Sequence, residues 1–129
     1  MNTKSKGSNA ERELIHAFWK VGFAALRSAG SGSMKYPCPD IIACKDHKRI
    51  VIECKITKDQ SKYFEKREID ELTLFAEKWK AEAYVAVKFK GKEWIFLKTQ
   101  DLVEKGKSWV INNDLATKKG RSFTQLITY

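Results

Sequence analysis

Three charged residues stand where two short apolar runs begin and end. Asp40 follows Pro39 and opens the run IIAC, whereas Glu53 and Lys55 close the run RIVIECK. Two carboxylates suit a hard cation such as Mg²⁺, which prefers oxygen ligands and keeps several of its waters. A lysine beside them can orient an attacking water or stabilise negative charge on a phosphoryl oxygen. These residue types therefore fit a site for metal-dependent phosphodiester cleavage.

The alternation of side chains along a strand brings these groups together. We predict strands over residues 40–44 and 49–56, joined as a hairpin by a short turn. In the second strand Glu53 and Lys55 point to the same face, because successive side chains alternate. The hairpin sets Asp40 next to them. The main-chain carbonyl of Cys54 is then a candidate third metal ligand.

A helix predicted over residues 8–22 supplies a further carboxylate. Ser8 lies three positions before Glu11, the spacing of a capping box, and Gly22 is a natural helix stop. At 100° per residue, Glu11 falls within the apolar stripe of the helix and faces inward. That stripe consists of Leu14, Ile15 and Phe18.

Structural explanations compete with the catalytic one. A triplet of Glu, any residue and Lys arises by chance in about one of two chains of this length. Glu11 could serve only as the capping partner of Ser8, and Glu53 with Lys55 could form a surface ion pair worth at most about 1 kcal/mol. Such a pair gives no account of Asp40, so we favour the site.

The remaining predicted elements define an α/β fold. The order of one helix, three strands, one helix and two strands predicts a central mixed β-sheet flanked by helices. Beyond Thr99 the pattern weakens: we expect a short helix within 101–106, a strand at 108–112, and a basic arm or partner-contacting tail over 116–129. The other predicted elements are strands at 23–28, 83–89 and 93–98 and a helix at 65–80.

The chain is strongly basic. Its 25 Lys and Arg against 16 Asp and Glu give a formal net charge of +9, which favours a polyanionic partner and above all nucleic acid. Any one basic cluster is more often a solvated face, but together they could follow a phosphate backbone. The clusters are Lys4 and Lys6; Lys45, Lys48 and Arg49; Lys58, Lys62, Lys66 and Arg67; and Lys88, Lys90 and Lys92.

Several classes of protein are disfavoured. No run approaches the roughly 18 apolar residues of a spanning helix, and the polar N-terminus lacks a secretory core, so we expect a cytoplasmic protein with no membrane partner. The odd number of cysteines, 3, indicates reduced thiols. The AGSGS stretch lacks the G-K-[ST] ending of a P-loop, so no nucleotide cofactor is expected. No G-x-S-x-G elbow supports a serine hydrolase.

Five segments resemble the archaeal-type Holliday junction resolvases, the Hjc group of the PD-(D/E)XK nuclease superfamily. They are KGSNAERELI, GFAALRSAGSGS, PCPDIIA, IECKITK and AEAYVAVKFKGKEWIFL, between Lys6 and Leu97. The resemblance implies a restriction-endonuclease-like fold. We therefore expect one nuclease domain over 1–129, with a core of about 6–98 and a C-terminal extension over 99–129.

The family's functional residues fall on the residues singled out above. The resemblance implies catalytic and metal-binding roles for Glu11, Asp40 and Glu53, and a catalytic role for Lys55. A functional loop serine aligns with Ser31, although Ser33 two positions later remains an alternative. The DNA contacts expected are Lys6, Arg12, Arg27, Ser33, Lys35 and Lys58.

The resemblance also implies an activity. Such enzymes act as homodimers that bind branched DNA, the four-way junction, and make paired nicks with Mg²⁺, for which Mn²⁺ substitutes. Two alternatives stay open: another PD-(D/E)XK endonuclease acting on linear duplex, or a non-catalytic basic module that binds DNA or RNA. Activity on linear duplex equal to that on junctions would indicate the first, and binding without cleavage the second.

Overall fold

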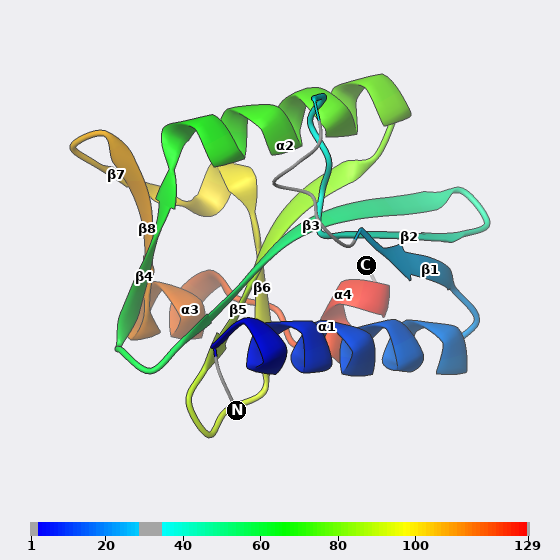
Figure 1. Cartoon of the computed structure of the whole chain (residues 1–129), viewed down its shortest axis with the longest axis horizontal. Helices are drawn as coiled ribbons and strands as arrows, with labels where there is room; N and C mark the ends of the chain where they lie inside the picture. The colour runs from blue at the N-terminus through cyan, green and yellow to red at the C-terminus, as the bar shows by residue number, and fades with distance from the viewer. Residues whose placement is uncertain (1–2, 29–34, 129) are drawn as a thin grey trace.

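A five-stranded mixed β-sheet forms the centre of the computed structural model, which describes residues 3–28 and 35–128. Neighbouring strands pair antiparallel except β3 and β5, which run parallel. The strands, in spatial order, are β1 (Ala24–Arg27), β2 (Ile41–Lys45), β3 (Lys48–Thr57), β5 (Glu82–Phe89) and β6 (Trp94–Lys98). Helices cover both faces of this sheet (Figure 1), so the predicted α/β arrangement is confirmed.

One face of the sheet is covered by the first and last helices, α1 (Thr3–Lys20) and α4 (Phe123–Thr128), as Figure 1 shows. Phe18 of α1 and Leu126 of α4 are both fully buried in the same core. The rings of Phe18 and Phe123 pack edge to face, with centroids 4.9 Å apart. The two ends of the chain therefore stabilise one another through this shared core.

The opposite face is covered by α2 (Lys66–Trp79), with α3 (Asn113–Lys119) packed further along. Glu65 and Glu68 form a reciprocal capping box at the start of α2, each side chain accepting a hydrogen bond from the other's backbone N–H. The helix ends at Lys80, whose φ of 58° is left-handed. Its buried stripe consists of Ile69, Leu72 and Ala76.

A second, three-stranded antiparallel sheet extends from this face. Its strands, in spatial order, are β4 (Ser61–Glu65), β8 (Ser108–Asn112) and β7 (Val103–Lys105). Phe64 and Ile111 from this sheet are fully buried against α2. Strand β8 confirms the strand predicted at 108–112, whereas β4 and the second sheet have no counterpart in the sequence prediction.

The first helix begins earlier than predicted. It starts at Thr3 and runs without interruption past Ser8, so Ser8 is a helix-interior residue and the predicted capping box with Glu11 is wrong. A cap residue needs a non-helical backbone, whereas Gly7 is accommodated within the helix at a cost of about 1 kcal/mol. Glu11 nevertheless faces inward, as the apolar stripe predicted, with a side chain only 17% exposed.

The C-terminal region is folded, so the predicted basic arm is wrong. The helix expected within 101–106 is replaced by the 3-10 turn η2 (Thr99–Asp101) and strand β7. Residues 116–128 carry α3 and α4, and between them Arg121 forms a two-way backbone bridge with Phe96 at the edge of β6. The tail thereby covers a sheet edge that would otherwise be open to pairing. None of the described helices is long and apolar enough to cross a membrane.

The packing of the tail on β6 predicts the effect of Gly120→Ala. A Cβ atom at Gly120 would clash with the carbonyl oxygen of Ala116 and with Cγ2 of Ile95. Overpacking of this kind costs about 1–3 kcal/mol. We expect a melting temperature several degrees lower by circular dichroism, since about 1 kcal/mol corresponds to roughly 2–8 °C in domains of this size.

The matched control is Gly7→Ala, because an added Cβ there meets nothing within 4 Å. It should leave stability unchanged or raise it by up to about 1 kcal/mol, as Ala is the better helix former. Equal melting temperatures for Gly120→Ala and the wild type would contradict the packed arrangement of the tail.

Candidate active site

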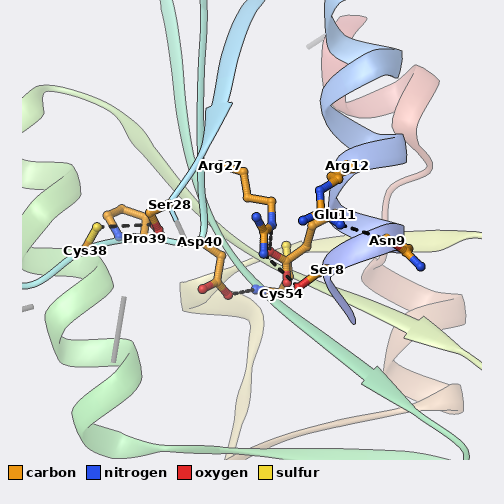
Figure 2. Close-up of polar contacts among 10 residues, drawn as sticks. All are labelled: Ser8, Asn9, Glu11, Arg12, Arg27, Ser28, Cys38, Pro39, Asp40 and Cys54. Atoms are coloured by element: carbon orange, nitrogen blue, oxygen red, sulfur yellow. Dashed lines mark hydrogen bonds and ion pairs between the residues drawn. The ribbon is translucent and has the colours of Figure 1, made fainter. Parts of the chain in front are cut away.

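The two central carboxyl groups come from neighbouring antiparallel strands. Asp40 directly precedes β2, and Ile41 pairs with Ile52, which sets Asp40 beside Glu53 and Cys54 of β3. Oδ2 of Asp40 accepts a hydrogen bond from the backbone N–H of Cys54 at 2.8 Å (Figure 2). The Asp40 carboxyl also acts on the Glu53 carboxyl and raises its pKa. The hairpin thus brings together the carboxyl groups that strand alternation predicted to meet.

The Glu53 carboxyl lies in surroundings that disfavour its charge. Burial, the hydrogen bond with Asp40 and the negative charges of Asp40 and Glu68 raise its pKa to about 10, against a lowering by Lys55. Without a cation, a shared proton relieves the repulsion between the two acids. A divalent cation would do the same in place of the proton. Adjacent, partly buried carboxyl oxygens are therefore a donor set that fits Mg²⁺.

Glu11 and Cys54, the other two predicted metal ligands, have less support from the structure. Within residues 3–28 and 35–128, no three His, Cys, Asp or Glu side chains are gathered as a ready metal cluster. The Cys54 thiol points into the core, where burial first and nearby acids second raise its pKa well above the usual value. Any ligand from Cys54 is thus its main chain, and the ligand roles of Glu11 and Cys54 stay predictions.

Glu11 is held by a basic residue from the edge strand. Nε of Arg27 donates to Oε1 of Glu11 at 3.1 Å, and Nη2 of Arg27 donates to Oγ of Ser8 at 2.8 Å (Figure 2). Burial and the charge of Asp40 raise the pKa of Glu11, and the Arg27 contact offsets part of that rise. Arg27, predicted to contact DNA, therefore pairs with Glu11 and Ser8 of α1 and holds the Glu11 side chain in place.

Lys55 points from β3 toward α2, on the same strand face as Glu53. Its Nζ atom lies 2.8 Å from Oε2 of Glu68 and 5.8 Å from the centroid of the Phe64 ring. Burial lowers the pKa of Lys55, but the hydrogen bond and charge of Glu68, with the charges of Glu53 and Asp40, raise it overall. Lys55 is therefore a fixed cation next to the two carboxyl groups.

The loop between β1 and β2 is anchored where it meets the site. The backbone N–H of Ser28 donates to the carbonyl of Asp40 at 2.9 Å, and its hydroxyl donates to the carbonyl of Pro39 (Figure 2). Sequence reasoning passed over Ser28 because nothing distinguishes it from other loop serines. Ser31 and Ser33, the predicted functional serines, lie outside the described residues.

The predicted DNA contacts are only partly placed. Arg12 extends from α1 and donates to Oδ1 of Asn9 at 3.1 Å (Figure 2). Lys35 is exposed and lies over the ring of Tyr36 at 5.8 Å. Lys58 is exposed immediately after β3, three residues beyond Lys55 and five beyond Glu53. The side chain of Lys6 is not among those described. These roles stay predictions.

One basic cluster has a structural role. Lys45 donates to the carbonyl of Val21 at the end of α1, and Arg49 donates to the carbonyl of Trp79 at the end of α2, each at 3.0 Å. Cations at helix C-termini satisfy free carbonyls and complement the helix dipole. This cluster lies roughly 20 Å along β3 from Lys55 at about 3.3 Å per residue.

The opposite end of β3 is where basic groups meet the site. The backbone N–H of Lys90 donates to the carbonyl of Thr57, which places the β5–β6 turn beside the end of β3. A shallow groove of about 290 Å³ separates this turn from α1. Its lining includes Asn9, Ala10, Glu13, Ile56, Lys88 and Lys90. Basic residues therefore lie at the end of β3 that follows Glu53 and Lys55: the exposed Lys58, the turn residue Lys90, and Lys88, whose Nζ donates to the carbonyl of Lys92.

Sequence reasoning missed Glu68 as part of the site. The signal available was its position three residues after Glu65, a capping-box spacing at the start of a helix. The usual capping-box pattern has Ser or Thr at the first position, so a pair of glutamates does not match it. Nothing local indicates that α2 sets Glu68 over Lys55, because that contact depends on the packing of α2 on β3.

The chain matches, over residues 2–129, a family described as archaeal Holliday junction resolvase (Hjc). Crossover junction endodeoxyribonuclease Hjc of Archaeoglobus fulgidus is 42% identical over 112 residues, which cover 87% of this chain and 82% of the relative. The protein of the same name from Sulfolobus acidocaldarius is 33% identical over 131 residues, covering 100% and 91%.

The fold leads to the same family. The 1.6 Å structure of Archaeoglobus fulgidus Hjc, a Holliday junction resolvase from an archaeal hyperthermophile, aligns with a TM-score of 0.87 at 36% identity. The alignment covers 93% of this chain and 98% of that one. The similarity continues beyond Leu97, where the resemblance noted from sequence segments ended. The chain has a restriction-endonuclease-like fold and belongs to the archaeal Holliday junction resolvase family, Hjc.

Proposed function

We propose that this chain is a DNA endonuclease that resolves four-way junctions by metal-dependent, paired nicking of opposite strands as a homodimer. The observation that carries this function is the pair of carboxyl groups on Asp40 and Glu53, with the Lys55 cation on the same strand face. The family and its relatives named crossover junction endodeoxyribonuclease support nuclease activity on branched DNA. The metal, the individual roles and the dimer are our extension.

The family's nuclease chemistry implies a divalent metal, and we assign Mg²⁺, with Mn²⁺ able to substitute. Asp40 and Glu53 would hold it, with Glu11 and the Cys54 carbonyl as the further ligands that the resemblance implies. When bound, such an ion polarises the phosphodiester and lowers the pKa of a coordinated water. The raised pKa of Glu53 supports this assignment, because the crowded carboxyl groups gain from any positive charge between them.

The other residues act on the phosphate or on the carboxylates. Lys55 offsets the negative charge that develops on the phosphoryl oxygens, for which a fixed cation in a partly buried site is well suited. Arg27 keeps Glu11 directed toward the Asp40 side of the cluster. Ser31 would be the catalytic serine of the loop before Asp40, with Ser33, a predicted DNA contact, as the alternative.

Junction DNA is recognised here through its backbone. The basic groups near the site, including Lys58 and Lys88, supply charges that follow phosphates and carry no base sequence information. A four-way junction differs from a duplex in geometry and deformability, so its recognition needs little base readout. Lys6, Arg12 and Lys35 are further DNA contacts that the resemblance implies.

A homodimer matches the symmetry of the substrate. A four-way junction has approximate two-fold symmetry, so two equal sites related by a two-fold axis can cut opposite strands. An apolar surface beside β1 is the face we assign to the second copy: Trp19 and Leu26 are 59% and 56% exposed there. It surrounds a depression of about 230 Å³ lined by small and apolar side chains, including Ala24, Ile42 and Trp79. Exposed apolar surface of this kind marks protein contacts.

We further propose that residues 1–129 act as one nuclease domain. The core shared by α1 and α4, and the bridge between Arg121 and Phe96, support treating the C-terminal region as part of it. Because the substrate is DNA, we propose that the enzyme acts in the cytoplasm, either of its source cell or of a virus-infected host.

Cleavage of a synthetic four-way junction tests the function. We expect Mg²⁺-dependent paired nicks in opposite strands of an end-labelled junction, none with EDTA, and far slower cleavage of its linear duplex arms. Glu53→Gln should lose about 100-fold or more in rate, since even outer partners of metal ligands cost 10–100-fold. The control Glu104→Gln removes an exposed carboxylate of β7 and should cut normally.

Each other result has a defined meaning. Equal cleavage of duplex and junction would assign the chain to duplex endonucleases. Tight junction binding without cleavage in Mg²⁺ or Mn²⁺ would indicate a binding module. Normal cleavage by Glu53→Gln would show that the catalytic role assigned to Glu53 is wrong.

The pKa of Glu53 predicts that Glu53→Gln, which should lower the cleavage rate, raises the stability of the fold in the absence of metal. Because the folded-state pKa is raised from 4.5 to about 10, the stability present below pH 4.5 is lost as pH rises toward 10. Glutamine resembles the protonated acid at every pH. In EDTA at pH 8, Glu53→Gln should therefore melt several degrees above the wild type, and the difference should vanish near pH 4.

Mg²⁺ should reverse that order. Added Mg²⁺ should raise the melting temperature of the wild type and of Glu104→Gln, and raise that of Glu53→Gln much less, because a ligand stabilises only the state that binds it. Equal stabilisation of all three proteins would show that Mg²⁺ does not bind between Asp40 and Glu53.

The assigned dimer face predicts that Leu26→Asp produces monomers. A buried, unpaired carboxylate at an apolar interface costs several kcal/mol in association. Sedimentation velocity should give about twice the 14.9 kDa chain mass for the wild type and the single-chain mass for Leu26→Asp. Val103→Asp, at a similarly exposed apolar position on β7, should remain dimeric. If both variants stay dimeric, the contact lies elsewhere.

A further inference from the structure

The start of α2 lies directly over the catalytic face of β3, and Glu68 is the residue that connects the two. Its carboxylate is held at both oxygens: Oε1 accepts from the backbone N–H of Glu65 at 3.1 Å, and Oε2 lies 2.8 Å from Nζ of Lys55. The Glu65 side chain in turn accepts from the backbone N–H of Glu68. The Glu68 side chain is 18% exposed, so this pair is shielded from most solvent. Glu68 is therefore a fixed anchor, attached to the helix end by its own capping box.

Lys55 is enclosed by the same corner of the fold. The Phe64 ring, fully buried on β4, lies on its other side, with 5.8 Å from Nζ to the ring centroid. Strand β4 ends at Glu65 and α2 begins at Lys66, so one continuous segment supplies both Phe64 and Glu68. The strand-to-helix corner thus sets the direction of the Lys55 side chain.

A lysine in this position needs such an anchor. Its four-carbon stem carries up to about 2 kcal/mol of rotamer entropy, so an unheld ammonium samples many positions. Asp40 and Glu53 are the strongest competing partners, since both act on Lys55 electrostatically. Among the described residues, however, the ion pair of Lys55 goes to Glu68 and not to either of those acids.

That choice of partner leaves the metal-binding acids available. An ammonium paired directly with Glu53 or Asp40 would occupy the oxygens that the cation requires. One N–H of Lys55 directed at Glu68 leaves two of its three donors for a phosphate oxygen or a water. The pairing therefore holds Lys55 near the reacting phosphate without blocking it.

We propose that Glu68 is a positioning residue of the nuclease site, whose carboxylate fixes the Lys55 ammonium beside Asp40 and Glu53 and keeps it from pairing with them. This role rests on the proposed function. Glu68 acts through Lys55 and does not touch the metal or the DNA.

Glu68→Gln is the variant that separates positioning from folding. Glutamine also serves at the third position of a capping box, so α2 keeps its cap while the ion pair to Lys55 is lost. Glu71→Gln is the matched control, because Glu71 lies one turn further on the same helix and pairs with the exposed Arg67. Both variants should melt within a few degrees of the wild type in EDTA.

The first readout is single-turnover cleavage of a four-way junction at saturating enzyme. We expect Glu68→Gln to slow cleavage by about 10–100-fold, the range for partners that orient active groups, with junction affinity in Ca²⁺ unchanged. Glu71→Gln should cleave at the wild-type rate. If Glu68→Gln cuts at or above the wild-type rate while Lys55→Met is inactive, Glu68 does not position Lys55 and only this inference fails. If the wild type itself cuts no DNA, the proposed function fails and Glu68 has no catalytic role to support.

The second readout is Mg²⁺ binding, followed as the Mg²⁺ concentration needed for half of the thermal stabilisation. Glu68→Gln should raise that concentration several-fold, because the freed Lys55 competes for Asp40 and Glu53. In a Lys55→Met background the same substitution should have a clearly smaller effect, because only the direct influence of the Glu68 charge on Glu53 is then lost. An equal effect in both backgrounds would show that Glu68 influences the metal site directly and would overturn the positioning role.

Discussion

The site depends on holding two carboxyl groups side by side in a partly buried place. The register of the β2–β3 hairpin sets Asp40 beside Glu53, and the backbone N–H of Cys54 on β3 donates to the Asp40 carboxylate. Burial first, and then the neighbouring Asp40, raise the pKa of Glu53 and disfavour its charged form. Such an arrangement opposes folding, so the surrounding cores must supply the stability that the site removes.

Two cationic side chains balance the acids from opposite layers of the fold. Arg27 reaches Glu11 on the α1 side of the sheet, and Lys55 reaches Glu68 on the α2 side. Each pair joins the central sheet to one helix. The position of the helices, and not only the hairpin, therefore determines where these charged side chains lie, so the packing of α1 and α2 shapes the candidate site.

The parts of the site that the sequence predicted are those set by local geometry. Strand alternation puts Glu53 and Lys55 on one face, and helical periodicity turns Glu11 inward. The Arg27 and Glu68 contacts depend on how separate elements pack, which no local pattern encodes. Strand β4 was not predicted, because its pairing with β8 joins segments more than forty residues apart. Only Phe64 is fully buried among its five residues, so its apolar signal is weak. The short helices α3 and α4 each bury one residue, too few for a periodic signal.

The basic residues divide between structure and substrate in a way that composition alone conceals. Lys45 and Arg49 donate to carbonyls at the ends of α1 and α2. At the other end of β3, Lys58 is exposed, and Lys88 donates to the carbonyl of Lys92 in the β5–β6 turn. Net charge is thus a poor measure of the DNA surface. The position of each basic side chain, and not the total charge, decides whether it is available to a polyanionic partner. The apolar hollow around Leu26 and the groove between α1 and the β5–β6 turn share no lining residue, so the surfaces that the proposed function assigns to a second copy and to DNA are separate.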